Sequence, residues 1–282
     1  MPERDRQYQF LDAGGGRKLE RFGEWILERP CAQAVWAPQH RELWREADAS
    51  FSRDRGAHWE FRSPRVKNGW TCELGGLSFI LKPTDFGHVG IFPEHLLGWR
   101  LAEESIAAAL PRRLSILNLF AYSGGATLAC ARAGAEVCHL DASRKMTDWA
   151  RDNANANHLQ DAPVRWIVDD VTKFLNREIR RGRKYDGIIL DPPSFGRGTS
   201  KELFQIDQCM LELLDLCRQC LSDTPSFVLL TCHTPGYTPL VLSHLAAQSF
   251  PEGEIKTGEM ILPVAGNALA VPSGAYAFWQ PK

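Results

Sequence analysis

One run of residues points directly to ligand chemistry: Asp191-Pro192-Pro193-Ser194-Phe195, which follows an apolar segment. Two consecutive prolines remove two backbone N–H donors and stiffen the chain. Carbonyl oxygens and the Asp191 carboxylate then remain as hydrogen-bond acceptors, which suits a planar ligand that bears an amino group. Phe195 is placed to stack on such a ligand. The alternative interpretation of this run is a simple turn.

A cysteine offers a second kind of chemistry. Cys232 follows the apolar segment Ser226–Thr231 and is therefore expected at the same sheet edge as Asp191. As a thiolate it would be a nucleophile, and His233 would help by lowering the thiol pKa. Neighbouring side chains on a strand point to opposite faces, so His233 could act on Cys232 only where the strand is irregular. The competing interpretation is a small buried thiol, the common role of an unpaired cysteine.

Three further loops together suggest a nucleoside pocket. Gly124 and Gly125 allow a tight turn before a helix. Asp141 ends the next apolar segment and can accept both hydroxyls of a ribose, whereas Asp170 followed by Val171 offers a carboxylate and a backbone N–H to adenine. Each acid alone is also explained as a helix N-cap, and the glycine turn alone as a connection. The three features in succession predict the pocket.

The elements that must position these residues alternate between strands and helices. This alternation predicts an α/β fold with a parallel sheet covered on both faces, whose carboxyl edge holds the ligand. We expect a β-rich region over residues 1–85, with hairpins around Gly14-Gly15-Gly16 and Gly75-Gly76, and a second domain over 86–282. The expected strands are 114–120, 135–140, 164–168, 187–190, 226–231, 260–264 and 275–279, and the expected helices are 96–110, 127–132, 144–157, 171–181, 201–221 and 240–250.

Composition excludes several classes of protein. Lys+Arg is 33 and Asp+Glu 34, so no global positive field attracts nucleic acid, and a polyanion would need a local patch. No apolar run approaches the roughly 20 residues of a membrane span, and the charged N-terminus has no signal-like segment. Eight cysteines suit a reducing cytoplasm. Cys217 and Cys220 lack a second ligand pair, so we expect no metal.

Taken together, these motifs resemble the class I S-adenosylmethionine-dependent methyltransferases. The run NLFAYSGGATLACARAGAEVCHLDAS is similar to the cofactor motif of the branch that includes the large-subunit ribosomal RNA 5-methylcytosine methyltransferase I family. LDPPSFGRG and LLTCH are similar to two later motifs of that branch, and residues 86–95 to its G-[FY]-F-x-D-Q-R segment. The chain departs from the family at Pro93-Glu94-His95, at Leu96, at His233 in place of Ser, and in showing no PUA-type module.

The resemblance implies a Rossmann-like sheet, mostly parallel with an antiparallel last strand, and a small β-rich N-terminal extension. It also implies S-adenosylmethionine as cofactor. Asp191 and Cys232 are the implied catalytic residues, and Pro193, Phe195 and Arg197 the implied substrate contacts. The implied cofactor residues are Phe86, Gly90, Ile91, Phe92, Asn118, Phe120, Tyr122, Gly124, Asp141, Ala142, Ser143, Asp170, Val171, Asp191 and Pro192.

By this resemblance the protein would methylate a base of RNA, with ribosomal RNA favoured. A Cys232 thiolate adding to carbon 6 of cytosine would let carbon 5 accept the methyl group. The alternatives are methylation of an exocyclic amine at the Asp-Pro-Pro edge, a substrate other than RNA, a cofactor-binding protein without catalysis, and a nucleotide-dependent dehydrogenase, which the missing G-x-G-x-x-G disfavours. The cations considered for phosphate contact are Arg62, Arg65, Lys67, Lys82, His88, Arg197 and Lys201, whereas those of residues 177–184 precede a strand and are expected at the opposite edge.

Overall fold

The computed structural model describes residues 7–54, 56–197, 203–263 and 269–282. The chain divides into two compact units. The first comprises Met1–Leu96 and Ile261–Ser273, and the second comprises Leu97–Met260 and Gly274–Lys282. Among the described residues, none of the helices combines the length and hydropathy that a membrane-spanning segment needs.

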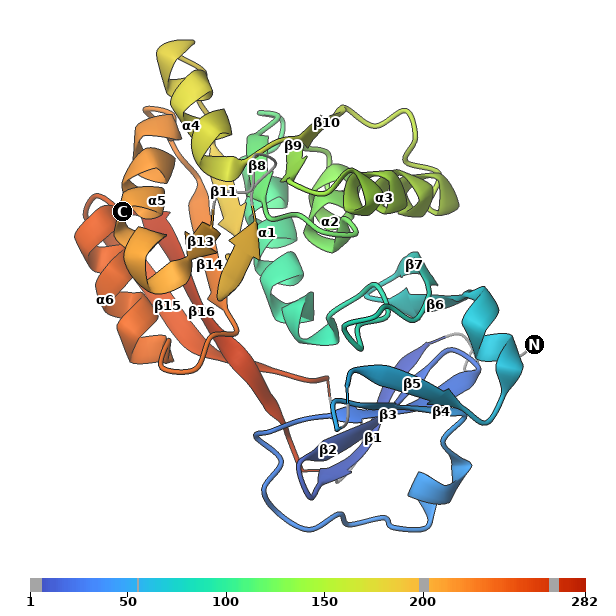
Figure 1. The fold of residues 1–282 in the computed structure, drawn as a ribbon. Helices are drawn as coiled ribbons and strands as arrows, with labels where there is room; N and C mark the ends of the chain where they lie inside the picture. Colours follow the sequence, from blue (N-terminus) through green and yellow to red (C-terminus); the bar gives the residue numbers. More distant parts are fainter. Residues whose placement is uncertain (1–6, 55, 198–202, 264–268) are drawn as a thin grey trace. The chain divides into compact units, whose positions relative to one another are not determined.

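The second unit is built on a seven-stranded sheet with the order β10-β9-β8-β11-β14-β16-β15 (Figure 1). The strands from β10 to β14 run parallel, and β16 is antiparallel to β14, which confirms the predicted sheet. Because β8 pairs with β9 on one side and β11 on the other, the order in which successive strands are added reverses at β8, and such a switch point is where α/β sheets bind ligands. The strands are β8 (Ser115–Leu119), β9 (Glu136–Asp141), β10 (Val164–Val168), β11 (Gly187–Leu190), β14 (Phe227–Cys232), β15 (Gly253–Ile261) and β16 (Pro272–Pro281).

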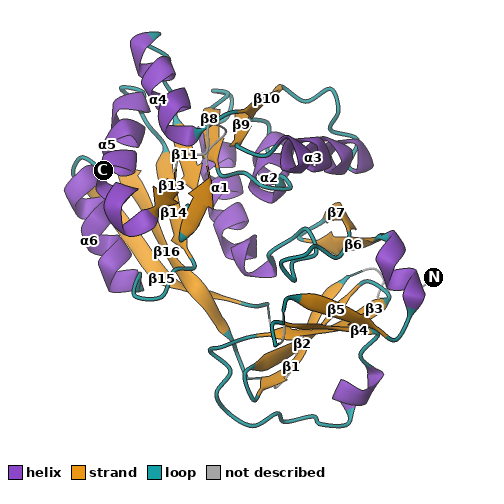
Figure 2. Ribbon diagram, viewed as in Figure 1, coloured by secondary structure: helices purple, strands orange, loops and turns teal. Residues whose placement is uncertain are grey.

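Each face of this sheet has its own apolar core, because successive strand residues point to opposite faces. Figure 2 shows the helices around the strands of this sheet. Ile116 and Ile189 pack with residues of α1 and α2, whereas Leu117 and Leu190 pack with residues of α4, α5 and α6. The predicted covering of both faces is therefore confirmed. The helices are α1 (Leu96–Ala109), α2 (Gly125–Arg132), α3 (Arg144–Ala156), α4 (Val171–Arg180), α5 (Ile206–Cys220) and α6 (Pro239–Ser249).

The first unit contains a five-stranded sheet, β1-β2-β3-β4-β5, and a separate β6–β7 hairpin. Both predicted hairpins are confirmed. Each turns at a glycine pair with two positive φ values, 60° and 77° at Gly15-Gly16 and 60° and 74° at Gly75-Gly76. Two positive φ angles in succession suit glycine and match the twist of the strands. The strands are β1 (Tyr8–Gly14), β2 (Arg17–Phe22), β3 (Trp25–Pro30), β4 (Ala49–Ser52), β5 (His58–Phe61), β6 (Trp70–Leu74) and β7 (Leu77–Leu81).

Three parts of the structure differ from the sequence-based expectation. The strand expected over 260–264 is instead β15, which begins at Gly253 and ends at Ile261. Strands β3, β4 and β5 were not predicted. Strands β4 and β5 have only four residues each, and β5 has no buried residue. The helix expected from Lys201 begins instead at Ile206, because β13 (Leu203–Gln205) pairs with β12 (Phe195–Arg197) just before it. Lys201 lies outside the described residues, as does Val264, the expected end of one strand.

A buried ion pair lies in the sheet of the first unit. The Glu20 carboxylate accepts hydrogen bonds from Arg29 (Nη2, 2.6 Å) and from the Tyr8 hydroxyl (3.0 Å), and Lys18 lies 3.3 Å away. Burial raises the pKa of Glu20, but the charges of Arg29 and Lys18 and these hydrogen bonds outweigh burial, so the pKa is lowered overall. The folded protein therefore favours ionised Glu20.

We expect Glu20→Gln to destabilise the protein by about 3 kcal/mol at pH 7, because the Arg29 charge stays buried without its partner. A lowered folded pKa means that ionised Glu20 stabilises the fold above the unfolded pKa of about 4.3, and that this contribution is lost as the pH falls. Urea unfolding at pH 7 and pH 3.5 checks this, with exposed Glu60→Gln as control. If the free energy of unfolding of wild type exceeded that of Glu20→Gln by the same amount at both pH values, ionised Glu20 would not be the stabilising form.

Candidate functional site

The turn after β8 has an unusual backbone. Two non-glycine residues, Phe120 and Tyr122, have positive φ angles of 55° and 49°, and Gly124 follows with 93° as the N-cap of α2. Positive φ at a non-glycine residue costs on the order of 1 kcal/mol and persists only where surrounding contacts enforce it. The Ala121 N–H donates to the Leu140 carbonyl (3.0 Å), which ties the turn to β9. The turn therefore has a specific, enforced shape.

Both glycines of this turn are required by close packing. A Cβ on Gly124 would lie 2.9 Å from the Cβ of Ala150 on α3. A Cβ on Gly125 would lie 2.3 Å from Cζ2 of Trp99 on α1. The absence of side chains lets the start of α2 approach α1 and α3, which brings the backbone N–H groups of the helix start to the sheet edge.

Asp141, at the end of β9, points to the same turn. Its Oδ2 accepts the N–H of Tyr122 (2.9 Å) and its Oδ1 that of Ser143 (2.8 Å). Burial raises the pKa of Asp141, although the two hydrogen bonds oppose this. The capping alternative is wrong for Asp141, since Ser143 is the N-cap of α3 and accepts from Met146, with Ala142 between the two. Each carboxylate oxygen retains acceptor capacity for a ribose hydroxyl.

The Asn118 side chain lies inside the second unit rather than in the turn. It is 3% exposed, and its Nδ2 donates to the Thr127 hydroxyl at 2.9 Å. The same hydroxyl lies 2.9 Å from Nδ1 of His139, which is opposite Asn118 on the adjacent strand. Burial, with a smaller contribution from Arg151, lowers the pKa of His139 to about 3, so the ring is neutral. This polar chain supports the end of β8 from one face.

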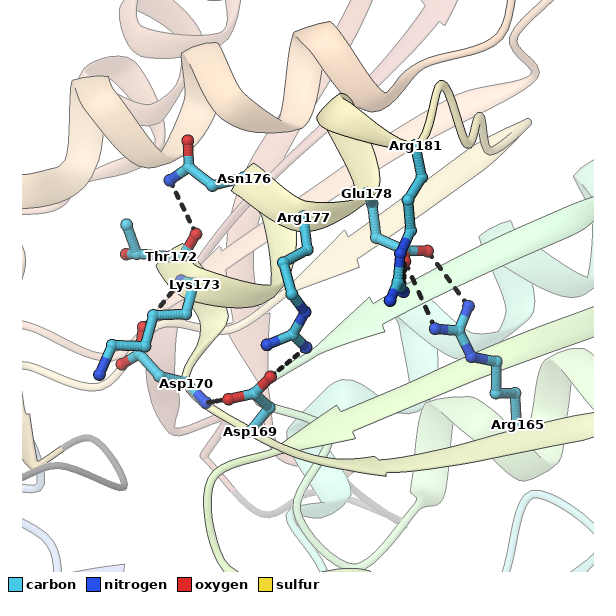
Figure 3. A network of polar contacts seen from close by, with 9 residues as sticks. All are labelled: Arg165, Asp169, Asp170, Thr172, Lys173, Asn176, Arg177, Glu178 and Arg181. Carbon is cyan, nitrogen blue, oxygen red and sulfur yellow. Dashed lines mark hydrogen bonds and ion pairs between the residues drawn. The ribbon is translucent and has the colours of Figure 1, made fainter.

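Two acids follow β10, and Figure 3 shows how they differ. The Asp170 carboxylate accepts the N–H of Lys173 (3.0 Å) and caps α4, which begins at Val171. The Asp169 carboxylate accepts the N–H of Asp170 (2.8 Å) and pairs with Arg177. The capping interpretation of Asp170 is therefore confirmed. Its second oxygen and the Val171 N–H at the helix start remain compatible with the predicted adenine contact.

Just after β11, Asp191 is held by Thr231 of β14 and by His233, which directly follows β14. Its Oδ1 accepts the Thr231 hydroxyl (2.8 Å), and its Oδ2 lies 3.5 Å from Nε2 of His233. Sequence reasoning considered His233 only as a partner for Cys232 and did not consider Thr231. The spacing of Thr231 and His233 could have indicated this contact, since residues two positions apart on an extended strand point to the same face. The Asp191 side chain is 29% exposed, so it remains accessible.

The Cys232 side chain occupies the opposite face from Thr231 and His233. It is 0% exposed and belongs to the apolar core formed with α5 and α6. Burial raises the pKa of this thiol, and the Asp191 and Asp207 carboxylates add to the increase although hydrogen bonds with Thr234 oppose it. His233 contacts Asp191, so the predicted help to the thiol is replaced by a contact with the carboxylate.

The residues after Asp191 differ in exposure. Pro192 is buried and Pro193 exposed, and Phe195 is 69% exposed at the start of β12. The Ser194 hydroxyl lies 2.7 Å from that of Thr234, which links this loop to the one after β14. Arg197 ends β12. An exposed aromatic ring beside a rigid Pro-Pro edge offers a stacking surface for a planar ligand.

The predicted cofactor residues Phe86, Gly90, Ile91 and Phe92 belong to the first unit. Phe86 is 74% exposed, Ile91 is buried, and Gly90 has a φ of 119° that only glycine adopts readily. The Phe92 ring is half-buried and lies 4.9 Å from the ring of His88. These positions remain predicted contacts.

The donor set of the second unit fits an adenosyl ligand. Within one sheet edge it provides a glycine turn with backbone N–H groups, a carboxylate at the end of β9 for a diol, and a carboxylate with a neighbouring N–H at the start of α4 for a base edge. None of these groups requires a phosphate, and the turn lacks the spacing of a pyrophosphate loop. The chemistry is that of a nucleoside rather than a dinucleotide.

Known proteins with similar sequences and structures agree with this geometry. A solved S-adenosylmethionine-dependent methyltransferase from Agrobacterium tumefaciens is 36% identical, with a TM-score of 0.92 over 98% of this chain and 91% of that chain. A ribosomal RNA large subunit methyltransferase K/L of Syntrophotalea carbinolica is 35% identical over 129 residues, 45% of this chain and 17% of that protein. A ribosomal RNA large subunit methyltransferase I of Aeromonas salmonicida is 34% identical over 39% of this chain and 28% of that protein.

The chain thus spans less than a third of the length of these two curated relatives. A family model for S-adenosylmethionine-dependent methyltransferases matches residues 21–251, which is most of the chain. The chain therefore belongs to the S-adenosylmethionine-dependent methyltransferase family and is an enzyme that uses S-adenosylmethionine as its cofactor.

Proposed function

We propose that this enzyme methylates an exocyclic amine of an RNA base at the Asp191-Pro192-Pro193 edge. The observation that carries the proposal is the contrast between two side chains at the end of the sheet. Asp191 is accessible and held in place by Thr231 and His233, whereas Cys232 is buried in the core. The C5-cytosine route through Cys232 is the alternative.

An acceptor edge of this kind suits an amine. The Asp191 carboxylate accepts a hydrogen bond from the amine N–H, which orients the nitrogen lone pair, and Phe195 stacks on the base. The cofactor supplies an electrophilic methyl group on a sulfonium. As the new nitrogen–carbon bond forms and the sulfur–carbon bond breaks, the nitrogen loses one proton. Asp191 and His233 are the proton acceptors that this edge provides, and rigid prolines keep the geometry fixed.

The alternative route needs a thiolate that reaches carbon 6 of cytosine. Burial and two carboxylates raise the pKa of Cys232, so the reactive ionised form is disfavoured. The Cys232 side chain is also fully buried within the apolar core. Both observations support the amine route, which requires no cysteine.

Cys232→Ala distinguishes the two routes. We expect this variant to keep methyl transfer within about threefold of wild type, because a buried thiol that only packs contributes chiefly to stability. Cys217→Ala is the matched control, since Cys217 is equally buried in the same core. Turnover and thermal unfolding are measured for both. Loss of transfer by Cys232→Ala alone, with cofactor affinity retained, would establish the adduct route instead.

RNA is supported as substrate by the ribosomal RNA methyltransferases among the relatives and by the exposed Phe195 ring. Nucleosides from ribosomal and transfer RNA of cells lacking the protein are compared by mass spectrometry with those of complemented cells. We expect one methylated nucleoside with an exocyclic methylamino group to be missing. A missing 5-methylcytidine would favour the alternative, and unchanged nucleosides would point to a protein or small-molecule substrate or to a binding protein.

The eight unpaired cysteines fit the proposed cytoplasmic location.

A further inference from the structure

The first unit carries a short row of exposed cations that the reaction chemistry does not use. Arg62 follows β5, and Arg65 and Lys67 lie on η3, a turn of 3-10 helix over Pro64–Asn68. All three side chains are exposed, and that of Arg65 reaches 73%. We call these three residues the cationic strip. Strand β5 beside it is the edge strand of its sheet.

Aromatic rings and backbone contacts hold the strip in place. The Arg65 guanidinium lies over the Trp25 ring at 5.3 Å, and the Lys67 ammonium over the Phe61 ring at 4.9 Å. The Arg62 guanidinium donates to the Arg45 carbonyl at 2.9 Å. Long side chains packed in this way keep the charged group in water while their stems are ordered, so less entropy is lost when an anion binds.

The turn beneath the strip is anchored as well. Val66, between Arg65 and Lys67, is fully buried and fixes η3 to the core. Gly69 ends the turn with a φ of 79°, and a Cβ there would lie 2.8 Å from the Leu81 carbonyl oxygen. The two cations therefore project from a rigid turn rather than from a loose loop.

The strip has fewer carboxylate partners than Arg165, Arg177 and Arg181 of the second unit. There, Arg177 pairs with Asp169, and Arg165 and Arg181 share the buried Glu178 carboxylate (Figure 3). In the strip, Arg65 forms a long ion pair with Glu24 at 3.8 Å, with the Arg65 side chain 73% exposed. Within the part of the chain that the structure describes, no acidic side chain forms an ion pair with Arg62 or Lys67.

We propose that the cationic strip binds the phosphate backbone of the RNA substrate. The proposal rests on the proposed function and adds a binding surface to it. Arg and Lys side chains that contact phosphates are the groups by which proteins hold single-stranded nucleic acid without reading its sequence, and here aromatic rings keep the cations in place. The nearly neutral chain has no global field to attract RNA, so such a local patch would supply the electrostatic attraction.

The test is a triple charge removal, Arg62→Gln/Arg65→Gln/Lys67→Gln, in the full chain. Affinity for a 20-nucleotide single-stranded RNA of mixed sequence is measured by fluorescence anisotropy between 50 and 200 mM salt. Each phosphate contact contributes about 0.7 to the slope of log affinity against log salt, so the slope should fall by about 2. The ratio of wild-type to variant RNA affinity should therefore fall roughly 15-fold as the salt concentration rises from 50 to 200 mM.

The chain offers a matched control in Arg180, Arg183 and Lys184, which are also two arginines and one lysine, all exposed. The corresponding triple Gln variant should keep the wild-type slope. Calorimetry with S-adenosylmethionine should give unchanged affinity for both variants. If the strip variant and wild type had equal salt slopes and both methylated RNA, the strip would not bind the RNA backbone, although the proposed function would stand. Absence of RNA binding by wild type would overturn both.

Discussion

Asp191→Asn is expected to lower kcat/KM for methyl transfer by about 10²- to 10³-fold, the usual effect of removing one well-placed polar group from a reaction centre. Thr231 donates to one carboxylate oxygen at 2.8 Å, and His233 lies 3.5 Å from the other. The amide keeps the size but turns one acceptor into an NH₂ donor. That group would face either the His233 ring or the substrate amine, and both contacts are unfavourable when each side presents N–H.

The measurement is steady-state transfer of a labelled methyl group, with cofactor affinity determined by calorimetry. Asp215→Asn is the control, because Asp215 is an exposed carboxylate on α5 that accepts from Arg218 and Gln219. We expect the control to match wild type. Asp191→Asn activity within threefold of wild type would rule out the carboxylate as the acceptor for the amine.

Asp141→Asn is expected to weaken cofactor binding by about 10- to 100-fold, or roughly 1.4 to 3 kcal/mol. The carboxylate accepts two turn N–H groups, from Tyr122 at 2.9 Å and from Ser143 at 2.8 Å. An amide has one acceptor oxygen, so one N–H would face an NH₂ group and the turn would shift. Because burial raises the pKa of Asp141, neutralising it also removes a desolvation cost, and the loss of stability should be smaller than the loss of affinity.

A matched control lies at the other end of the same sheet. Asp186 accepts the Ser115 N–H (2.9 Å) and the Ser222 hydroxyl (2.9 Å) at the amino ends of the strands. Asp186→Asn should lower the temperature of unfolding without changing cofactor affinity. Calorimetry and thermal unfolding of both variants separate the two effects. An equal change in affinity for both would show that Asp141 acts only through stability.

Much of the second unit was predictable because its signals are local. The bounds of β10 and β11 are those expected from short apolar segments, and the glycine turn and the acids follow the expected strands. Strands β4 and β5 of the first unit were not predictable, since each has only four residues and β5 has none buried. The start of α5 was misplaced because Leu203–Gln205 forms the short strand β13, which pairs with β12 before the helix begins.

By itself the sequence determined that several chemically active residues would meet at one sheet edge, since apolar strands alternating with helices form a parallel sheet with its carboxyl ends together. Only the tertiary structure decided which way each side chain points. Cys232 lies in the core, whereas His233 contacts Asp191. Alternation along a strand predicts that neighbouring side chains point to opposite faces, but the packing of the helices decides which face is buried. The tertiary structure also decided which cations are paired with carboxylates, since ion pairs such as Arg165–Glu178 join residues on separate elements.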